Sequence, residues 1–221
     1  KQVVGAAQED VESLIKQEKF SDAFDFCDQL AQIDGDGEAT ITAEEVREIG
    51  LAAGNARVRR EQFAEAAAIR RQLAERYPRD VGVINLGRAV LAQGIPFTQG
   101  LLETVPVPAA DLRLAGALNE ELNLLASELT QSASDAAGVA AEAELARSLR
   151  GEIVRQGDAT VRAHLEQLQI GAAVLAVDAL REHFADDSLV VPLDDAVVEA
   201  GTELAAEQIE AQAMVDAATL L

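Results

Sequence analysis

The chain has 221 residues, 49% of them apolar and only 3% aromatic, so its core must consist mainly of Ala, Leu, Val and Ile. Its formal net charge of -21 at pH 7 argues against nucleic-acid binding through an extended basic surface, because that binding depends on clustered Lys and Arg. The single Cys excludes an intramolecular disulfide, and no apolar run reaches the roughly 20 residues that a membrane-spanning helix needs.

Apolar residues of the first half recur at helical spacing, and no segment shows the alternation of a strand. Two helices carry the same motif, Phe-x-x-Ala, which begins at Phe20 and again at Phe63, 43 residues later. The connecting sequence between them contains a Gly-rich acidic loop over residues 34–41. The predicted helices cover residues 6–17, 20–33, 42–60, 62–76 and 80–94.

Residues 6–95 resemble tetratricopeptide repeats, in which each unit is a pair of helices. The matching positions are Phe20, Ala23, Gly54, Phe63, Ala66 and Pro78. This resemblance implies an α-α superhelix and a non-catalytic scaffold or adaptor that binds a protein partner. The chain departs from the family pattern where Gly94-Ile95-Pro96 interrupts the third unit, and it lacks the large aromatic residue early in the first helix.

A Pro-containing break over residues 96–110 separates this region, residues 1–95, from a second helical region, residues 111–221. Asp158 and Pro192 are typical helix-start signals in the second region. Its predicted helices cover residues 111–130, 135–156, 159–185 and 194–219. They are expected to form either a helical bundle or further degenerate hairpins of the same superhelix, and the periodicity does not separate these two architectures. The predicted fold class is therefore all-α.

Residues 34–45 resemble the calcium-binding loop of an EF-hand, although Ala39 replaces the usual glycine of the sharp turn. The resemblance implies five calcium ligands: Asp34, Asp36, Glu38, Thr40 through its carbonyl oxygen, and Glu45. The alternative interpretation is an acidic surface loop followed by a helix, with Thr42 and Glu45 as a capping box. Calcium is the one cofactor that the sequence suggests, and a scaffold requires none.

Residues 42–95 are an Arg-rich island, with nine basic and seven acidic side chains, whereas residues 96–221 carry six and 22. The tetratricopeptide resemblance implies a groove lined by the first helix of each unit, which would contain Lys16, Asn55, Arg59 and Arg88. An amide beside guanidinium groups suits a carboxylate, so we expect an acidic segment or a C-terminus of a protein partner to bind there. Alternatively, the arginines pair along their own helices and neutralise the chain's own carboxylates.

Other functions have less support in the sequence. An acidic stripe on the last helix, Glu199, Glu203, Glu207 and Glu210, is either a solvated face or a surface that docks on arginines, including those of a second copy in a homo-oligomer. A small acidic enzyme of unknown chemistry remains an alternative, but the two histidines, His164 and His183, do not form a di-iron pattern. We expect a soluble protein, cytoplasmic or extracytoplasmic after removal of a leader.

Overall fold

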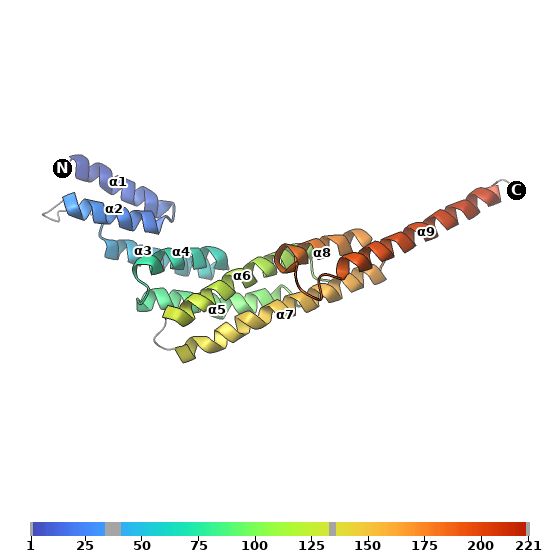
Figure 1. Ribbon diagram of the computed structural model, residues 1–221. Coiled ribbons are helices and arrows are strands. Elements are labelled where there is room, and N and C mark those ends of the chain that lie inside the picture. Colours follow the sequence, from blue (N-terminus) through green and yellow to red (C-terminus); the bar gives the residue numbers. More distant parts are fainter. Residues whose placement is uncertain (1, 34–40, 133–135, 220–221) are drawn as a thin grey trace. The chain divides into compact units, whose positions relative to one another are not determined.

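The structure is a computed structural model that describes residues 2–33, 41–132 and 136–219. Helices cover almost all of these residues and no strand occurs among them, so the all-α prediction is confirmed (Figure 1). In chain order the helices are α1 (Gln2–Lys16), α2 (Phe20–Ile33), α3 (Ala43–Arg59), α4 (Phe63–Arg76), α5 (Val81–Gly100), α6 (Ala109–Ser132), α7 (Ala136–Glu166), α8 (Ile170–Phe184) and α9 (Leu193–Thr219).

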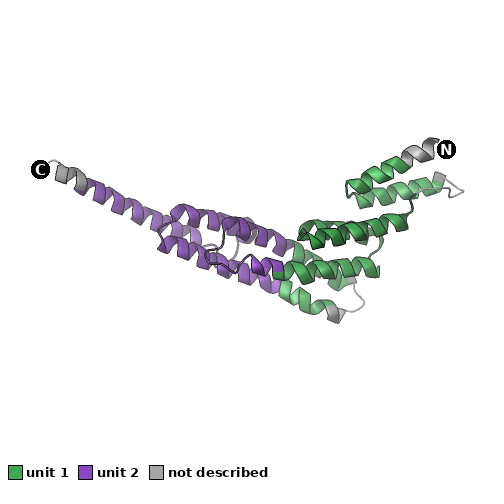
Figure 2. Ribbon diagram, turned by 180° about the vertical axis from the view of Figure 1, so that it is seen from behind, with its two compact units in different colours: residues 1–96, 121–146 green, residues 97–120, 147–221 purple. Residues whose placement is uncertain are grey.

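The helices belong to two compact units (Figure 2). The first unit contains residues 1–96 and 121–146, and the second contains residues 97–120 and 147–221. Helices α5, α6 and α7 therefore contribute residues to both units. The predicted groove residues Lys16, Asn55, Arg59 and Arg88 belong to the first unit, and the acidic stripe belongs to the second.

The turns that join α1 to α2 and α3 to α4 have the same backbone geometry. Glu18 and Glu61 each adopt the left-handed conformation, with φ angles of 58° and 61°. In both turns the next residue donates a backbone hydrogen bond of 3.0 Å to the carbonyl five residues earlier. Phe20 and Phe63 then begin the second helix and are 0% and 3% exposed. The repeated Phe motif thus marks the same position in two like hairpins.

Two glycines bring α3 close to its neighbouring helices. A Cβ atom on Gly50 would lie 2.7 Å from Leu73 of α4, and a Cβ atom on Gly54 would lie 2.5 Å from Leu86 of α5. The same Cβ atom on Gly50 would lie 3.3 Å from the side chain of Phe20 on α2. An added methyl group at either site would force the leucine side chain to move, so glycine allows the helix backbones to approach closely there.

A third turn of the same kind joins α7 to α8 in the second unit. Leu168 has a φ angle of 56°, and the N–H of Gln169 donates to the carbonyl of His164 at 2.8 Å. The side chains of His164 and Gln169 are also in contact, with Nδ1 of the histidine 2.9 Å from Oε1 of the glutamine. In the α3–α4 turn, Arg57 Nη1 donates to Gln62 Oε1 at the same distance.

The helices on either side of this third turn also pack as α3 and α4 do. Gly157 of α7 faces Leu180 of α8, and a Cβ atom on the glycine would lie 2.4 Å from the leucine. Gly50 and Leu73 lie 107 residues earlier in the chain, and the same offset relates the two turns. The α7–α8 hairpin therefore repeats the packing of the α3–α4 hairpin.

One predicted helix end is wrong. We expected Gly94-Ile95-Pro96 to interrupt the helix, but α5 continues through Pro96 to Gly100. Pro96 is exposed, whereas Ile95 and Thr98 are 4% and 0% exposed, so the buried face of the helix continues past the proline. The irregular segment is residues 101–108, which is shorter than the predicted break over 96–110.

A predicted helix start is also wrong. Asp158 does not begin a helix, because α7 continues through it to Glu166. Its carboxylate instead accepts a hydrogen bond of 3.0 Å from Arg162, one turn later on the helix surface. As a result, His164 and His183, which we expected on one helix, lie on α7 and α8.

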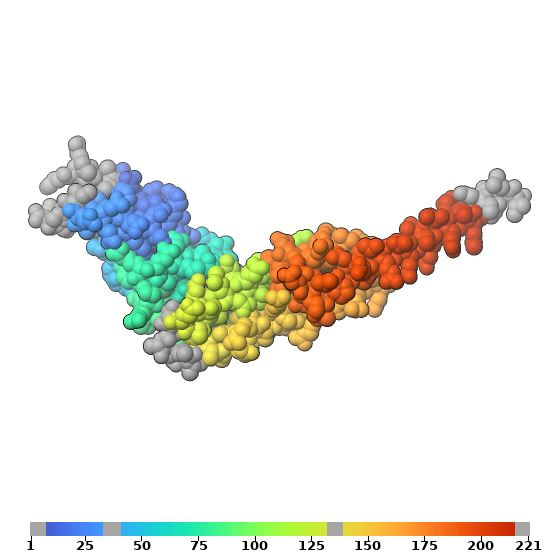
Figure 3. All heavy atoms as spheres, in the orientation of Figure 1, coloured from blue at the N-terminus to red at the C-terminus, as the bar shows by residue number. Residues whose placement is uncertain are grey.

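The last helix, α9, packs against the rest of the second unit through its first turns. Leu193 and Val197 are 3% and 6% exposed, and Leu204 is half-buried. Every residue from 205 to 214 is exposed, and this part of the helix protrudes from the second unit in Figure 3.

Candidate functional site

Most arginines of the Arg-rich island form ion pairs that join different segments of the first unit. The pairs are Arg47–Asp80, Arg57–Glu18, Arg70–Glu128, Arg71–Glu121 and Arg76–Asp28. We considered pairing along a single helix as the alternative to partner binding. These five arginines do neutralise the chain's own carboxylates and each links one element to another, while Arg47 also pairs with Glu44 on its own helix.

Arg76, at the end of α4, is an example of such a link. Its terminal nitrogens donate to the two carboxylate oxygens of Asp28 on α2, at 2.5 and 2.7 Å. The guanidinium Cζ also lies 5.5 Å from the ring centroid of Phe24 and 5.9 Å from that of Tyr77. The hydrogen bonds from Arg76 lower the pKa of the Asp28 carboxyl below its ordinary value. This arginine therefore joins α4 to α2.

Arg57 places two hairpin turns next to one another. Its Nη2 and Nε donate to Oε1 of Glu18, the left-handed residue of the α1–α2 turn, at 2.8 and 3.1 Å. Arg57 lies in the last turn of α3, immediately before the α3–α4 turn. The two turns are therefore neighbours at the same end of these four helices (Figure 1).

Four exposed basic residues surround these two turns, and we call them the basic edge: Lys16, Lys19, Arg59 and Arg60. The Lys16 ammonium has Glu12 at 3.8 Å, and its side chain is 78% exposed. Within the described residues, the side chains of Arg59 and Arg60 make neither an ion pair nor a hydrogen bond. The basic edge thus offers cations to an external ligand.

Lys16 and Arg59 were predicted as groove residues, whereas Arg60 was assigned only to the Arg-rich island and Lys19 to neither. Their proximity depends on the contact between the two turns, which no local motif reveals. The 43-residue offset of the Phe motif was the available signal, because it also aligns residue 16 with residue 59.

Two other residues, Asn55 and Arg88, were predicted to line the groove. Asn55 is exposed one helical turn before Arg59, on the same face of α3, and its Nδ2 donates to the carbonyl of Leu51 at 2.8 Å. Arg88 lies on α5 and is half-buried. Asn55 therefore extends the exposed surface of the basic edge along α3, whereas Arg88 lies on another helix.

A pocket of about 320 Å³ lies between α4 and α6 in the first unit. Its lining includes Arg70, Arg71, Glu75 and Glu128. Arg70 is 2% exposed and donates to Glu128 at 2.5 Å, while burial and the like charge of Arg71 lower the pKa of its guanidinium. Since Arg70 is covered, the charged groups that a ligand would meet are one arginine and two glutamates. This pocket suits an anion less well than the basic edge does.

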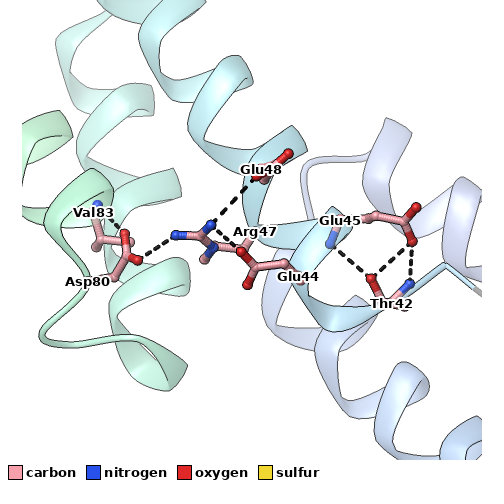
Figure 4. Close-up of polar contacts among 7 residues, drawn as sticks. All are labelled: Thr42, Glu44, Glu45, Arg47, Glu48, Asp80 and Val83. Carbon is pink, nitrogen blue, oxygen red and sulfur yellow. Dashed lines mark hydrogen bonds and ion pairs between the residues drawn. The ribbon is translucent and has the colours of Figure 1, made fainter.

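The predicted calcium loop is only partly described. Four of its five predicted ligands lie outside the described residues: Asp34, Asp36, Glu38 and Thr40. The fifth, Glu45, forms a capping box with Thr42 at the start of α3 (Figure 4). Its Oε2 accepts hydrogen bonds from the N–H and the hydroxyl of Thr42, at 2.7 and 3.0 Å, and these bonds lower the pKa of Glu45. The capping box is confirmed, and calcium binding stays a prediction.

Arg47, also on α3, links that helix to the start of α5. Its terminal nitrogens bind Asp80 and Glu44, and Glu48 lies 3.7 Å away (Figure 4). Asp80 in turn accepts a hydrogen bond of 3.0 Å from the N–H of Val83, in the first turn of α5. Because these charges bind one another, we interpret this cluster as a joint between elements.

The described part of the chain contains no group of three or more His, Cys, Asp or Glu side chains that could hold a metal ion. Cys27 is buried and its thiol donates to the carbonyl of Ile41 at 3.2 Å. Burial raises the pKa of this thiol, which disfavours the nucleophilic thiolate. His183 Nδ1 lies 2.9 Å from Glu120 Oε1 in a surface contact.

Comparisons of the chain with protein-family models, with curated proteins and with solved structures gave no match. None of the described helices has the length and apolarity needed to cross a membrane. The basic edge is therefore the candidate functional site on the strength of its own geometry and charge.

Proposed function

We propose that this chain is a non-catalytic helical scaffold that binds an acidic segment of a partner protein through the basic edge. The observation that carries this proposal is the exposure of Arg59 and Arg60, which have no acidic partner among the described residues, in a chain of net charge -21. Arg57, close by in the sequence, pairs with Glu18, whereas Arg59 and Arg60 remain for an external carboxylate.

The repeated hairpins support a tetratricopeptide-like arrangement. The α1–α2 and α3–α4 hairpins share one turn geometry, and α3 packs on both α4 and α5 through Gly50 and Gly54. In tetratricopeptide arrays the first helix of each pair faces the binding groove. By that resemblance, Asn55 and Arg59 on α3 would contact the ligand, and the Asn55 amide would exchange its bond to Leu51 for one to a carboxylate.

The electrostatics favour a ligand with several carboxylates. An exposed ion pair stabilises a complex by about 0.2–1 kcal/mol, so a single carboxylate would bind weakly. The Debye length at physiological ionic strength is about 8 Å, so the basic edge acts on a nearby ligand more strongly than the distant carboxylates of the chain do. A run of Asp and Glu in a partner would meet all four cations.

The test measures the fluorescence anisotropy of a labelled Glu-rich peptide, with a Gln-rich peptide of equal length as the negative control. We expect the Arg59→Glu, Arg60→Glu double variant to bind the Glu-rich peptide at least about tenfold more weakly than the unsubstituted protein. The matched control, Arg79→Glu with Arg155→Glu, changes the net charge equally at exposed positions outside the basic edge. Equal losses in both double variants would contradict the proposal.

A further inference from the structure

The α9 helix carries charge of one sign only. It contains seven acidic residues and no basic residue. Four of them, Glu199, Glu203, Glu207 and Glu210, follow one another at spacings of four, four and three, and all four are exposed. Such spacings place side chains on one face of a helix, so α9 presents a continuous acidic stripe to solvent.

Two of the four stripe residues, Glu207 and Glu210, lie on a part of α9 where every residue is exposed. Every residue from 205 to 214 is exposed, including the apolar side chains of Ile209 and Met214, which are 70% and 74% exposed. Like charges four residues apart destabilise a helix, and a helix without tertiary packing is marginally stable in water. A cationic surface laid along the stripe would remove both penalties.

We propose that the acidic stripe of α9 docks on the basic edge of a second copy of this chain. The inference rests on the proposed function, since it names the acidic segment that the basic edge binds. The charges are complementary, with four exposed carboxylates on the stripe and four exposed cations on the edge, where the exposed acids are Glu61 and Glu12, the partner of Lys16. From Glu199 to Glu210 the stripe extends about 16 Å at 1.5 Å per residue, enough to cross two neighbouring turns.

The contact joins two different surfaces, so it is heterologous. Each copy keeps one unused surface after docking, and association continues until a ring closes or a chain of copies forms. Because the contact consists of exposed charges, its strength falls as salt rises. The chain therefore self-associates in a concentration-dependent and salt-dependent way.

The test is sedimentation velocity on the full chain at several protein concentrations, in low and in high salt. Two charge-reversed variants are prepared: Arg59→Glu with Arg60→Glu, and Glu203→Arg with Glu207→Arg. Each variant alone opposes like charges in the contact and stays monomeric. The first variant keeps its acidic stripe, and the second keeps its basic edge. In a mixture, the stripe of the first variant binds the edge of the second, so the mixture associates.

Two further variants serve as controls for net charge. Arg79→Glu with Arg155→Glu, and Asp178→Arg with Asp186→Arg, make the same charge changes at exposed residues outside both surfaces, and mixtures of these controls behave as the unsubstituted chain does. A mixture of the charge-reversed variants that remains monomeric overturns the inference, as does an unsubstituted chain that is monomeric at every concentration. Either result leaves the proposed function intact if the Glu-rich peptide still binds.

Discussion

The guanidinium of Arg57 binds the carboxylate of Glu18 across two hairpins, with Nη2 2.8 Å from Oε1. Both side chains are about one-third exposed, at 27% and 33%. Glu18 is also the residue that turns the chain between α1 and α2. The ion pair therefore fixes one turn of the basic edge relative to the other.

A double-mutant cycle measures the strength of this contact. Glu18→Gln, Arg57→Gln and the double variant are unfolded with urea, and their free energies of unfolding are compared with that of the unsubstituted chain. We expect a coupling energy of about 0.5–1 kcal/mol, the upper range for a partly exposed pair. Additive effects would show that the two turns are not coupled through this pair.

The glycines of α7 should respond to substitution in opposite ways. A Cβ atom on Gly157 would lie 2.4 Å from Leu180, whereas a Cβ atom on Gly151 would meet no atom within 4 Å. We expect Gly157→Ala to lower the free energy of unfolding by about 1–3 kcal/mol through overpacking. Gly151→Ala should raise it by about 0.5–1 kcal/mol, because alanine favours the helix. Urea unfolding of both variants gives the comparison, and the same sign for both would contradict the close packing.

In the turn between α7 and α8, a substitution to glycine should stabilise the protein. Leu168 has a φ angle of 56° and is 59% exposed, so glycine would relieve the left-handed backbone and remove little buried surface. We expect Leu168→Gly to raise the free energy of unfolding by up to about 1 kcal/mol. Ala141→Gly, at an exposed position inside α7, should lower it by about 1 kcal/mol. Calorimetric melting temperatures distinguish the two, and a destabilised Leu168→Gly would argue against this turn.

These turns also show what the sequence could reveal. The first two were predictable, because Phe20 and Phe63 follow a polar turn and repeat an obvious motif. The third was not, because Ile170 replaces the phenylalanine and Leu168, an apolar residue, takes the left-handed position. Gly157-Asp158 has the composition of a helix boundary, but the glycine serves close packing inside α7.

The candidate site was predictable to the same extent. Lys16 and Arg59 occupy equivalent positions of two repeated hairpins, so an alignment of the repeats selected both. Lys19 and Arg60 join them through a contact between turns that are far apart in the sequence. Composition correctly marked an Arg-rich region, but it did not separate Arg76, which binds Asp28, from Arg59, which lies exposed.

The capping box predicts how acid affects stability. Hydrogen bonds from Thr42 lower the pKa of Glu45 in the folded protein, so its contribution is fully present above the unfolded pKa of about 4.3. That contribution is lost as the pH falls through the lower, folded pKa. We expect Glu45→Gln to be less stable than the unsubstituted chain at neutral pH, with the difference shrinking in this acidic range. Urea unfolding at several pH values tests this, with exposed Glu65→Gln as the control.

The calcium hypothesis makes its own prediction about the same carboxylate. Binding to residues 34–45 would require Glu45 to exchange its hydrogen bonds with Thr42 for the ion. Calcium would then raise the melting temperature relative to a chelator at equal ionic strength, because a ligand of the folded state stabilises it. Asp34→Ala with Glu45→Gln would abolish that rise. Equal melting temperatures in calcium and chelator would contradict the hypothesis.

The most direct test of the central claim locates the bound acidic segment on the protein. Backbone amide chemical shifts are recorded on the isotopically labelled chain while the Glu-rich peptide is added. We predict that the largest changes fall on residues 16–19 and 55–62, and that they vanish in the Arg59→Glu, Arg60→Glu variant. Changes centred elsewhere, or changes of equal size in that variant, would show that the basic edge is not the binding surface.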